Sequence, residues 1–512
     1  MAGVLPFLTD KHLNILFLIG AGLIVVGMPY SLVLMSIGTI WVSSVYILQG
    51  NYRDKLKKAG SPVVLCLLGF LTYYFVALIW TQDLTQGWKE GLKILPLVVI
   101  PLVFSGITGV SHRQKKGLMW LFVAATLSSV LVCYGVALAR GTLTTGDPRE
   151  ISFLTSHIRL SLFVCLSVLW VVISQLNPWL KLLLSLILLS FIVVVQSITG
   201  ISVLLFLSIA VLLGIIPVKG ISTIRMLRSI TATVLILSFV FLGFTTIDYY
   251  SVKTKVPTPK FTKFGNKYNT EFENNFVENG SYLWSYICKD ELEQAWKERT
   301  DRSVWVQEGG EFADYAVITR YLNNSNLTKD REGVNALSDE DIERIISGNP
   351  YPNHWKYKGF SKRLRGFFFQ IEKSQLNADY TGNSITEKLM YQQAGWHVFS
   401  SHWLIGAGTG DLKSELNTYY RDQYPSMNEN YRRKPHNQFL TVGAMFGVIG
   451  LILFLLFFWS LWRSPSDMSV TILRSFILIV LLSFLSEDTA SSQAGITFIG
   501  FFSGLLVSLR PA

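Results

Sequence analysis

The chain has 512 residues, of which 50% are hydrophobic and only 15% are charged, and its formal net charge is +11. Soluble domains usually carry about 25% charged residues, so this composition excludes an ordinary soluble protein. The hydrophobic residues also gather in runs of about 20, the length that a helix needs to cross a bilayer. Because the cations lie in short loops between these runs, we attribute the positive charge to membrane topology and expect no nucleic-acid partner.

These runs predict about twelve membrane helices. The first begins near Leu13, and because no small-residue cleavage pattern follows it, we interpret it as a retained helix and not as a signal peptide. The fourth and twelfth runs are short for a full span. The expected ranges are 13–29, 31–49, 62–80, 94–108, 117–139, 158–176, 179–196, 200–217, 230–248, 437–462, 470–486 and 496–509.

Loop charges predict the orientation. The loops after the second, fourth and eighth expected helices are rich in Lys and Arg, and these three loops fall on one side by parity. Basic loops stay in the cytoplasm, so we expect both termini to be cytoplasmic and the polar segment 249–436 to lie outside. The cations that carry this argument are Arg53, Lys55, Lys57, Lys58, Arg113, Lys115, Lys116, Lys219, Arg225 and Arg228.

The expected fold is an all-α polytopic membrane helix bundle with a large, mostly helical loop on its outer side. We divide the chain into an N-terminal membrane block over 1–248 with about nine helices, the loop over 249–436, and a C-terminal membrane block over 437–512 with about three helices. Within the loop, start and stop signals predict helices over Ser338–Ile346, from the capping-box pattern at Ser384, and over Asp411–Tyr424.

The most informative segment is Arg432-Arg433-Lys434-Pro435-His436-Asn437, which leads directly into the apolar run from 437. His436 can accept a proton near neutral pH. It stands just before a helix N-terminus, where free backbone N–H groups favour an anion. The alternative is an interfacial histidine that caps the helix with Asn437 as its partner.

Two further cations are candidates for anion binding. Arg159 lies at the outer end of the sixth expected helix and could bind phosphate oxygens with two parallel hydrogen bonds, although a snorkelling Arg is the simpler alternative. Lys388 shares a helix face with Tyr391 and Gln392. The Gly-rich stretch 404–411 could present backbone N–H groups to an anion. The alternative for this stretch is a plain turn between helices, capped by Asp411.

Two acidic pairs complete the set of candidates. Glu487 and Asp488 lie at an outer membrane boundary, where they could orient His436 or an arginine or bind sugar hydroxyls, unless they form a solvated loop. Asp339 and Asp341 have the spacing of a divalent-ion motif, but they occupy the first turn of an expected helix, where acids stabilise the dipole. With no convincing metal spacing elsewhere, we expect no metal and no cofactor.

Several of these segments together resemble the O-antigen ligase and polymerase superfamily of bacterial membrane proteins. The Pro435–Leu440 string followed by Gly443, Phe446-Gly447 and Gly450 is similar to the family signature, and Leu404–Asp411 is similar to its Gly-rich stretch. His157-Ile158-Arg159 and Glu487-Asp488-Thr489 also resemble family members. One large outer loop late in the chain fits the family's topology.

The resemblance implies a GT-C-type glycosyltransferase of the bacterial inner membrane with its active site at the periplasmic face. The implied donor is a glycan on undecaprenyl diphosphate, and the implied acceptor is a hydroxyl of lipid A–core. The family uses arginines to hold the diphosphate and a histidine near the acceptor, without a metal. Carried over by position, Arg159 is a diphosphate ligand and His436 is the base.

One position departs from the family pattern. Lys388 stands where we match the family's loop arginine, and lysine keeps the charge but loses the two-pronged geometry. Either Lys388 suffices, or Arg421, Arg432 or Arg433 supplies the fork. Three alternative functions stay open: an O-antigen polymerase, a protein O-glycosyltransferase with the same donor, and a transporter of lipid-linked glycan. A transporter predicts ionisable groups deep within several spans, and the apolar runs here are nearly free of them.

Overall fold

The computed structural model describes residues 9–141, 148–217, 221–251, 260–269, 277–305, 314–352, 357, 359–376, 384–425, 427–466 and 468–507. The chain divides into two compact units. The first unit comprises Met1–Ala232 together with Glu387–Ala512, and the second comprises Thr233–Thr386. Residues 387–436, the last part of the expected outer loop, therefore fold with the helices of the first unit.

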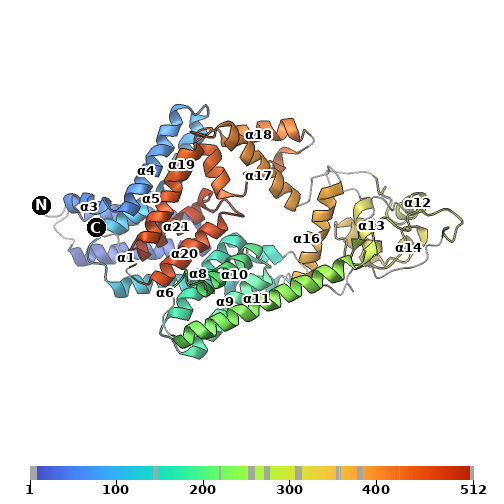
Figure 1. Ribbon diagram of the computed structural model, residues 1–512, viewed down its shortest axis with the longest axis horizontal. Helices are drawn as coiled ribbons and strands as arrows, with labels where there is room; N and C mark the ends of the chain where they lie inside the picture. The colour runs from blue at the N-terminus through green and yellow to red at the C-terminus, as the bar shows by residue number, and fades with distance from the viewer. Residues whose placement is uncertain are drawn as a thin grey trace. The chain divides into compact units, whose positions relative to one another are not determined.

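Among its described residues, every named secondary-structure element of the first unit is a helix (Figure 1). Its N-terminal helices are α1 (Asp10–Tyr30), α2 (Leu32–Leu48), α3 (Tyr52–Ala59), α4 (Pro62–Val76), η1 (Ala77–Ile79), α5 (Leu84–Gly106), α6 (His112–Ala139), η2 (Pro148–Ile151), α8 (His157–Ile173), α9 (Pro178–Val194) and α10 (Ile198–Leu212). Helix α11 (Ile221–Tyr250) continues from this unit into the second.

The C-terminal part of the first unit returns to the N-terminal helices. It contains α17 (Ser384–Ser401), α18 (Leu412–Gln423), η3 (Glu429–Tyr431), α19 (Gln438–Arg463), α20 (Val470–Ser483), η4 (Thr489–Ser491) and α21 (Gln493–Leu506). Helix α19 packs beside α4, and α21 packs along α5 (Figure 1). The Phe104 ring of α5 contacts Phe17 of α1 and Phe501 of α21, both at 5.3 Å between centroids, so aromatic packing joins the two ends of the chain.

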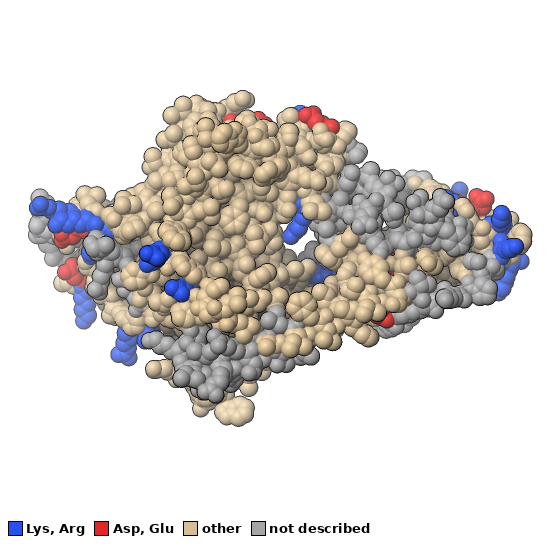
Figure 2. All heavy atoms as spheres, viewed as in Figure 1, with Lys and Arg blue, Asp and Glu red and all other residues tan. Residues whose placement is uncertain are grey.

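Helices occupy all twelve ranges expected from the apolar runs. Among the described residues, four helices are long and apolar enough to cross a membrane: α1, α4 extended by η1, α6 and α19. Six more are apolar but shorter. The face drawn in Figure 2 carries few Lys or Arg over α4 and α19, and they gather near α3, whose sequence holds Arg53, Lys55, Lys57 and Lys58.

Two helices begin well before their expected starts: α11 begins at Ile221, nine residues before 230, and α5 differs most. Helix α5 begins at Leu84, ten residues before the expected start at 94, because the Asp83 side chain accepts a hydrogen bond from Gln86 N and caps the helix. Its first half therefore carries Lys89, Glu90 and Lys93 in front of the apolar stretch that begins at Ile94. Hydropathy detects the apolar half only.

Helix α19 is bent at Gly447, whose φ of +62° departs from helical geometry. There the carbonyls of Ala444 and Met445 accept the N–H groups of Ala407 and Gly408 at 2.9 and 3.0 Å. In return, Val448 N donates to Trp403 O at 2.8 Å. The Gly-rich stretch is thus paired with the bend, and a Cβ at Gly447 would lie 2.3 Å from the backbone of Leu404.

The second unit is mostly helical in its described residues, as expected, with one small hairpin. It contains β1 (Val277–Glu278), β2 (Ser281–Tyr282), α12 (Lys289–Thr300), α13 (Asp314–Asn324), α14 (Arg331–Asn335), α15 (Asp339–Ile346) and α16 (Gly359–Leu376). The strands pair antiparallel across Asn279-Gly280, a turn sequence that suits the positive φ of both residues. Leu292, Trp296, Ile318 and Tyr321 are central members of its buried core.

The expected start of α15 is confirmed. Ser338 and Asp341 form a capping box, and Asp339 pairs with Arg299 at 2.9 Å. Asp341 therefore caps the start of α15, and Asp339 pairs with Arg299 of α12. Helix α17 begins at Ser384, but the side chain of Ser384, which the expected capping box requires, lies outside the described residues. The division of the chain at 248 and 436 stays a prediction about the membrane.

Candidate functional site

His436 lies in the loop between η3 and α19 with a left-handed backbone, φ +50°. Asn437 is the N-cap of α19, and its Oδ1 accepts Phe439 N at 3.1 Å and Leu440 N at 3.2 Å. Asn437 alone therefore caps the helix, and the imidazole is not needed for that task. About a quarter of the His436 side chain is exposed, so the imidazole is open to solvent.

Glu487 and Asp488 approach His436 from the loop after α20. Glu487 Oε2 lies 3.5 Å from His436 Nδ1, and Asp488 Oδ2 accepts the backbone N–H of His436 at 3.0 Å. The other Asp488 oxygen accepts the Thr441 hydroxyl at 2.5 Å. The two acids thus have different tasks, since Glu487 faces the imidazole and Asp488 fixes the backbone that carries it.

The two carboxyl groups also differ in pKa. Burial alone would raise the pKa of Glu487, but hydrogen bonding with His436 and the charge of Lys388 lower it below its ordinary value. The pKa of Asp488 is raised because its burial outweighs the bond from Thr441 and the nearby charges of His436 and Lys434. Glu487 is therefore the carboxylate that is held ionised beside the imidazole.

Helix α17 supplies Lys388 and Tyr391. Lys388 Nζ lies 3.6 Å from Glu487 Oε1, so Glu487 stands between an ammonium and an imidazole. The Tyr391 ring packs against His436 with centroids 5.6 Å apart. The Tyr391 hydroxyl is buried and has no hydrogen-bond partner among the described residues, and burial raises the pKa of Tyr391 to about 12. The Tyr391 hydroxyl is thus neutral and could donate a hydrogen bond to an acceptor.

Arg159 lies in the first turn of α8, partly buried, and interacts electrostatically with Glu487. Its guanidinium makes no ion pair within 4 Å in the described part of the chain. Because its charge is not neutralised by a close carboxylate, its forked donors are available to an anion. Arg159 and Lys388 therefore approach Glu487 from different helices.

The remaining candidate cations, Arg421, Arg432 and Arg433, differ in their partners. Arg433 is exposed and close enough to Tyr391 to act on its hydroxyl electrostatically. Arg432 contacts Glu429 Oε1 at 3.5 Å and donates to Met427 O at 3.1 Å, so it stabilises its own loop. Arg421 is exposed and donates to Thr418 on the same helix. Of these three, Arg433 is the one whose charge acts on Tyr391, the residue that packs against His436.

The Gly-rich stretch does not present its N–H groups to an anion. Ala407 and Gly408 donate to the bend of α19, and Thr409 N donates to Thr81 Oγ1 at 2.9 Å. Asp411 makes no side-chain cap on α18; its oxygens instead accept Gln82 N at 2.7 Å and Asp83 N at 2.8 Å. The alternative of a structural turn is right, but its expected cap by Asp411 is wrong.

Two contributors were missed in the sequence. Thr441 is one turn into α19, and its bond to Asp488 could have been suspected from a polar residue at the start of an apolar run. Glu90 lies 3.5 Å from Lys434 and 3.3 Å from Lys93, which ties α5 to the loop that carries His436. No local signal pairs Glu90 with a residue so distant in sequence.

The arrangement can bind an anion and move a proton. With Glu487 ionised and next to Nδ1, the favoured tautomer carries its proton on Nδ1 and leaves Nε2 free to accept one. Arg159, Lys388 and Arg433 supply positive charge near this imidazole from three different segments. Such a set suits a reaction in which a hydroxyl is deprotonated and an anionic leaving group departs.

A comparison with known protein families finds a match for the segment that carries most of this cluster. Residues 359–455 match the family model described as O-antigen ligase. The matched segment includes Lys388, Tyr391, Arg433, His436 and Asn437. No curated protein matches the chain. The resemblance noted in the sequence is confirmed by this match: residues 359–455 are similar to the O-antigen ligase family, which supports the O-antigen ligase superfamily for this chain.

Proposed function

We propose that the protein is an O-antigen ligase, which transfers a glycan from undecaprenyl diphosphate to a sugar hydroxyl of lipid A–core at the periplasmic face of the inner membrane. The observation that carries the proposal is the His436–Glu487–Lys388 cluster, two members of which lie inside the matched O-antigen ligase segment. Both termini would then be cytoplasmic, as the basic loops indicate.

The cations hold the donor. Arg159 binds two oxygens of the diphosphate through its fork, and Lys388 and Arg433 add charge from α17 and from the loop before His436. This use of Lys388 fits its position, because its side chain is 44% exposed beside Glu487 and its ammonium can approach a second anion. Converging cations stabilise the charge that develops on the departing diphosphate, so the proposal requires no metal.

His436 activates the acceptor. Its Nε2 takes the proton of the acceptor hydroxyl while the hydroxyl oxygen forms a bond to the anomeric carbon of the donor sugar. The bond from that carbon to the diphosphate oxygen breaks in the same step, and undecaprenyl diphosphate leaves with the bonding electron pair. A single displacement inverts the configuration of the sugar. Glu487 stabilises the imidazolium that forms, and the Tyr391 hydroxyl donates a hydrogen bond to a substrate oxygen.

The gathering of ionisable groups in one cluster supports an enzyme over a transporter, which would need them along a path through the bilayer. An O-antigen polymerase and a protein O-glycosyltransferase would use the same donor chemistry with another acceptor. The test of the ligase therefore has to distinguish lipid A–core from these two other acceptors, a lipid-linked glycan and a protein.

The test is made in the source bacterium after deletion of the gene, with wild-type or His436→Ala copies restored. Lipopolysaccharide is separated on a gel beside an extract of the lipid-linked glycans. A ligase predicts long polymer that accumulates on the lipid carrier, is absent from lipid A–core and is restored to the core by wild type alone. Single repeat units still attached to the core would indicate a polymerase instead. Unchanged lipopolysaccharide would refute the ligase and direct the search to glycoproteins.

A further inference from the structure

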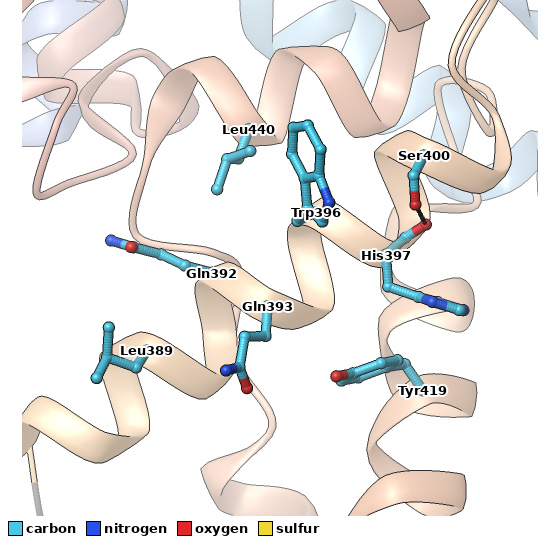
Figure 3. Close-up of a pocket in the computed structure, with 8 residues that line it drawn as sticks. All are labelled: Leu389, Gln392, Gln393, Trp396, His397, Ser400, Tyr419 and Leu440. Atoms are coloured by element: carbon cyan, nitrogen blue, oxygen red, sulfur yellow. Dashed lines mark hydrogen bonds between the residues drawn. The ribbon is translucent and has the colours of Figure 1, made fainter.

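A second feature of α17 is an open groove of about 490 Å³ that the His436 cluster does not use. Ligand sites typically measure about 300–1,000 Å³, so the groove is large enough for a small molecule or part of a larger one. Its walls come from α17, α18 and the first turn of α19, all within the first unit (Figure 3). The residues that matter here are Gln392, Gln393, Trp396, His397, Tyr419 and Leu440.

The groove follows one face of α17. Leu389, Gln393, Trp396 and Ser400 are spaced by three or four residues, so they form a continuous stripe along the helix, with Gln392 beside it. The neighbouring face carries the residues that contact the His436 cluster. A ligand in the groove would therefore lie along the same helix that orients the proposed catalytic groups.

The lining is aromatic and polar but uncharged. None of the eight residues that line the groove is Lys, Arg, Asp or Glu. Trp396 leaves 59% of its surface exposed, and the rings of His397 and Tyr419 lie one over the other with centroids 4.9 Å apart (Figure 3). The groove thus offers flat apolar surface and hydrogen-bonding groups without the cations that a diphosphate needs.

A neutral sugar ring has the complementary chemistry. One face of a pyranose presents C–H groups, which pack on the electron-rich face of an indole. Its edge presents hydroxyls that both donate and accept, as do the amides of Gln392 and Gln393. Gln393 already accepts a hydrogen bond from the Tyr424 hydroxyl at 3.3 Å, which leaves its NH₂ group as a donor. An anionic headgroup would find no charge to pair with.

The groove is also close in sequence and space to the His436 cluster. Gln392 directly follows Tyr391, whose ring packs on His436 at 5.6 Å, and Leu440 lies in the first turn of the helix that His436 precedes. We propose that this groove is a glycan subsite that binds an uncharged pyranose residue of one substrate through Trp396, His397, Tyr419 and the two glutamines. This inference rests on the proposed function, because it identifies the groove as part of the same substrate path.

The sugar could belong to the donor glycan or to the acceptor core, so the probes are chosen to separate these sources. One probe is the core oligosaccharide freed of lipid A, and the other is the O-glycan released from its lipid carrier. Purified full-length His436→Ala protein is mixed with each probe in detergent, and binding is followed by saturation-transfer NMR. Tryptophan and tyrosine resonances that transfer to sugar C–H groups would support the subsite, and the probe that responds identifies the source.

Trp403 provides a matched control, because it is also 59% exposed and follows the same helix but does not line the groove. Trp396→Ala is expected to weaken binding of the responding probe about tenfold, which is about 1.4 kcal/mol, whereas Trp403→Ala leaves it unchanged. Trp396→Phe retains an aromatic face and is expected to recover part of the affinity. Both Trp variants should keep the thermal stability of the parent, because the side chains are exposed.

The same variants, made in the wild-type background, are then assayed for transfer from lipid-linked glycan to lipid A–core. Trp396→Ala is expected to raise the KM of the responding substrate about tenfold with little change in kcat, since the groove binds a non-reacting sugar. Equal effects of Trp396→Ala and Trp403→Ala, or no binding of either probe, would overturn the subsite while transfer by wild type upholds the ligase. Binding that depends on Trp396 without any transfer would uphold the subsite and refute the proposed function.

Discussion

Replacing Glu487 by Gln tests the central pair of the site. Gln has the same shape and can still accept from His436 Nδ1, so the substitution removes the charge and keeps the geometry. For the 3.5 Å separation between Glu487 Oε2 and His436 Nδ1, Coulomb's law gives about 5 kcal/mol at an effective dielectric constant of about 20 and about 2.4 kcal/mol at about 40.

The lower figure applies, because Lys388 at 3.6 Å already offsets part of the Glu487 charge. A loss of about 2 kcal/mol in transition-state stabilisation corresponds to a fall of about 30-fold in kcat/KM. The assay is transfer of labelled lipid-linked glycan to lipid A–core by purified protein in liposomes. Glu415→Gln is the matched control, since Glu415 forms a similar pair with His402 at 3.7 Å outside the cluster. Activity of Glu487→Gln within about threefold of wild type would refute a role for this charge.

The pH dependence of this variant follows from the lowered pKa of Glu487. A carboxyl whose folded pKa lies below its unfolded value stabilises the fold above the unfolded pKa and loses this contribution as the pH falls through the folded value. The difference in thermal stability between wild type and Glu487→Gln is therefore expected to be present at about pH 5 and to shrink at more acidic pH, below about 4.5. A difference that disappears between pH 7 and pH 6 would contradict this assignment.

Four further changes test neighbouring parts of the account. Arg159→Lys is expected to raise the KM for the lipid-linked donor about tenfold by loss of the second hydrogen bond, and unchanged donor kinetics would remove Arg159 as a forked ligand. Thr441→Val should cost about 1–3 kcal/mol in unfolding free energy, whereas Thr441→Ser should not; equal stability of the two variants would be the contrary result. Tyr391→Phe should leave thermal stability unchanged, because the buried hydroxyl has no partner among the described residues, and should lower transfer by loss of a substrate hydrogen bond; full transfer would contradict this. Gly447→Ala should destabilise the protein by more than about 1 kcal/mol, whereas Gly135→Ala, where an added Cβ has no atom within 4 Å, should not, and similar melting curves would refute the bend argument.

Local sequence signals predicted the helices well. The apolar runs located all twelve helical ranges, and the pattern beginning at Ser338 located the capping box of α15. These features depend on residues within one or two turns of each other, so a single sequence contains the necessary information. The early start of α5 was missed because its first half is polar, and hydropathy is insensitive to a polar helix that continues into an apolar one.

The site was predictable as a set of residues but not as an arrangement. His436, Glu487 and Asp488 were selected for their chemistry at a membrane boundary, and Lys388 was selected for its helix face and its match to the family's loop arginine. The structure brings these four residues together. Their division of labour was not predictable, because it depends on which carboxylate faces the imidazole and which one binds the backbone. That geometry is set by the packing of loops that are about 50 to 100 residues apart in the chain.

The Gly-rich stretch shows the same limit in another form. Its glycines suggested an anion-binding turn, yet its N–H groups pair with a bend hidden inside the apolar run of α19. A single Gly447 within such a run gives no local indication that the helix is interrupted. The structural requirement for glycine becomes clear only from the close approach of the two backbones, which leaves no room for a Cβ at Gly447.

The most direct test of the account is transfer by purified protein in liposomes, with lipid-linked glycan and lipid A–core supplied and EDTA present, for wild type and His436→Asn. Asparagine tolerates the left-handed backbone of position 436, where φ is +50°, so this variant removes the imidazole without straining the loop. The account predicts metal-independent transfer by wild type and a rate lower by at least about 100-fold for a His436→Asn protein of unchanged thermal stability. Transfer by His436→Asn near the wild-type rate, or transfer by wild type that EDTA abolishes, would contradict it.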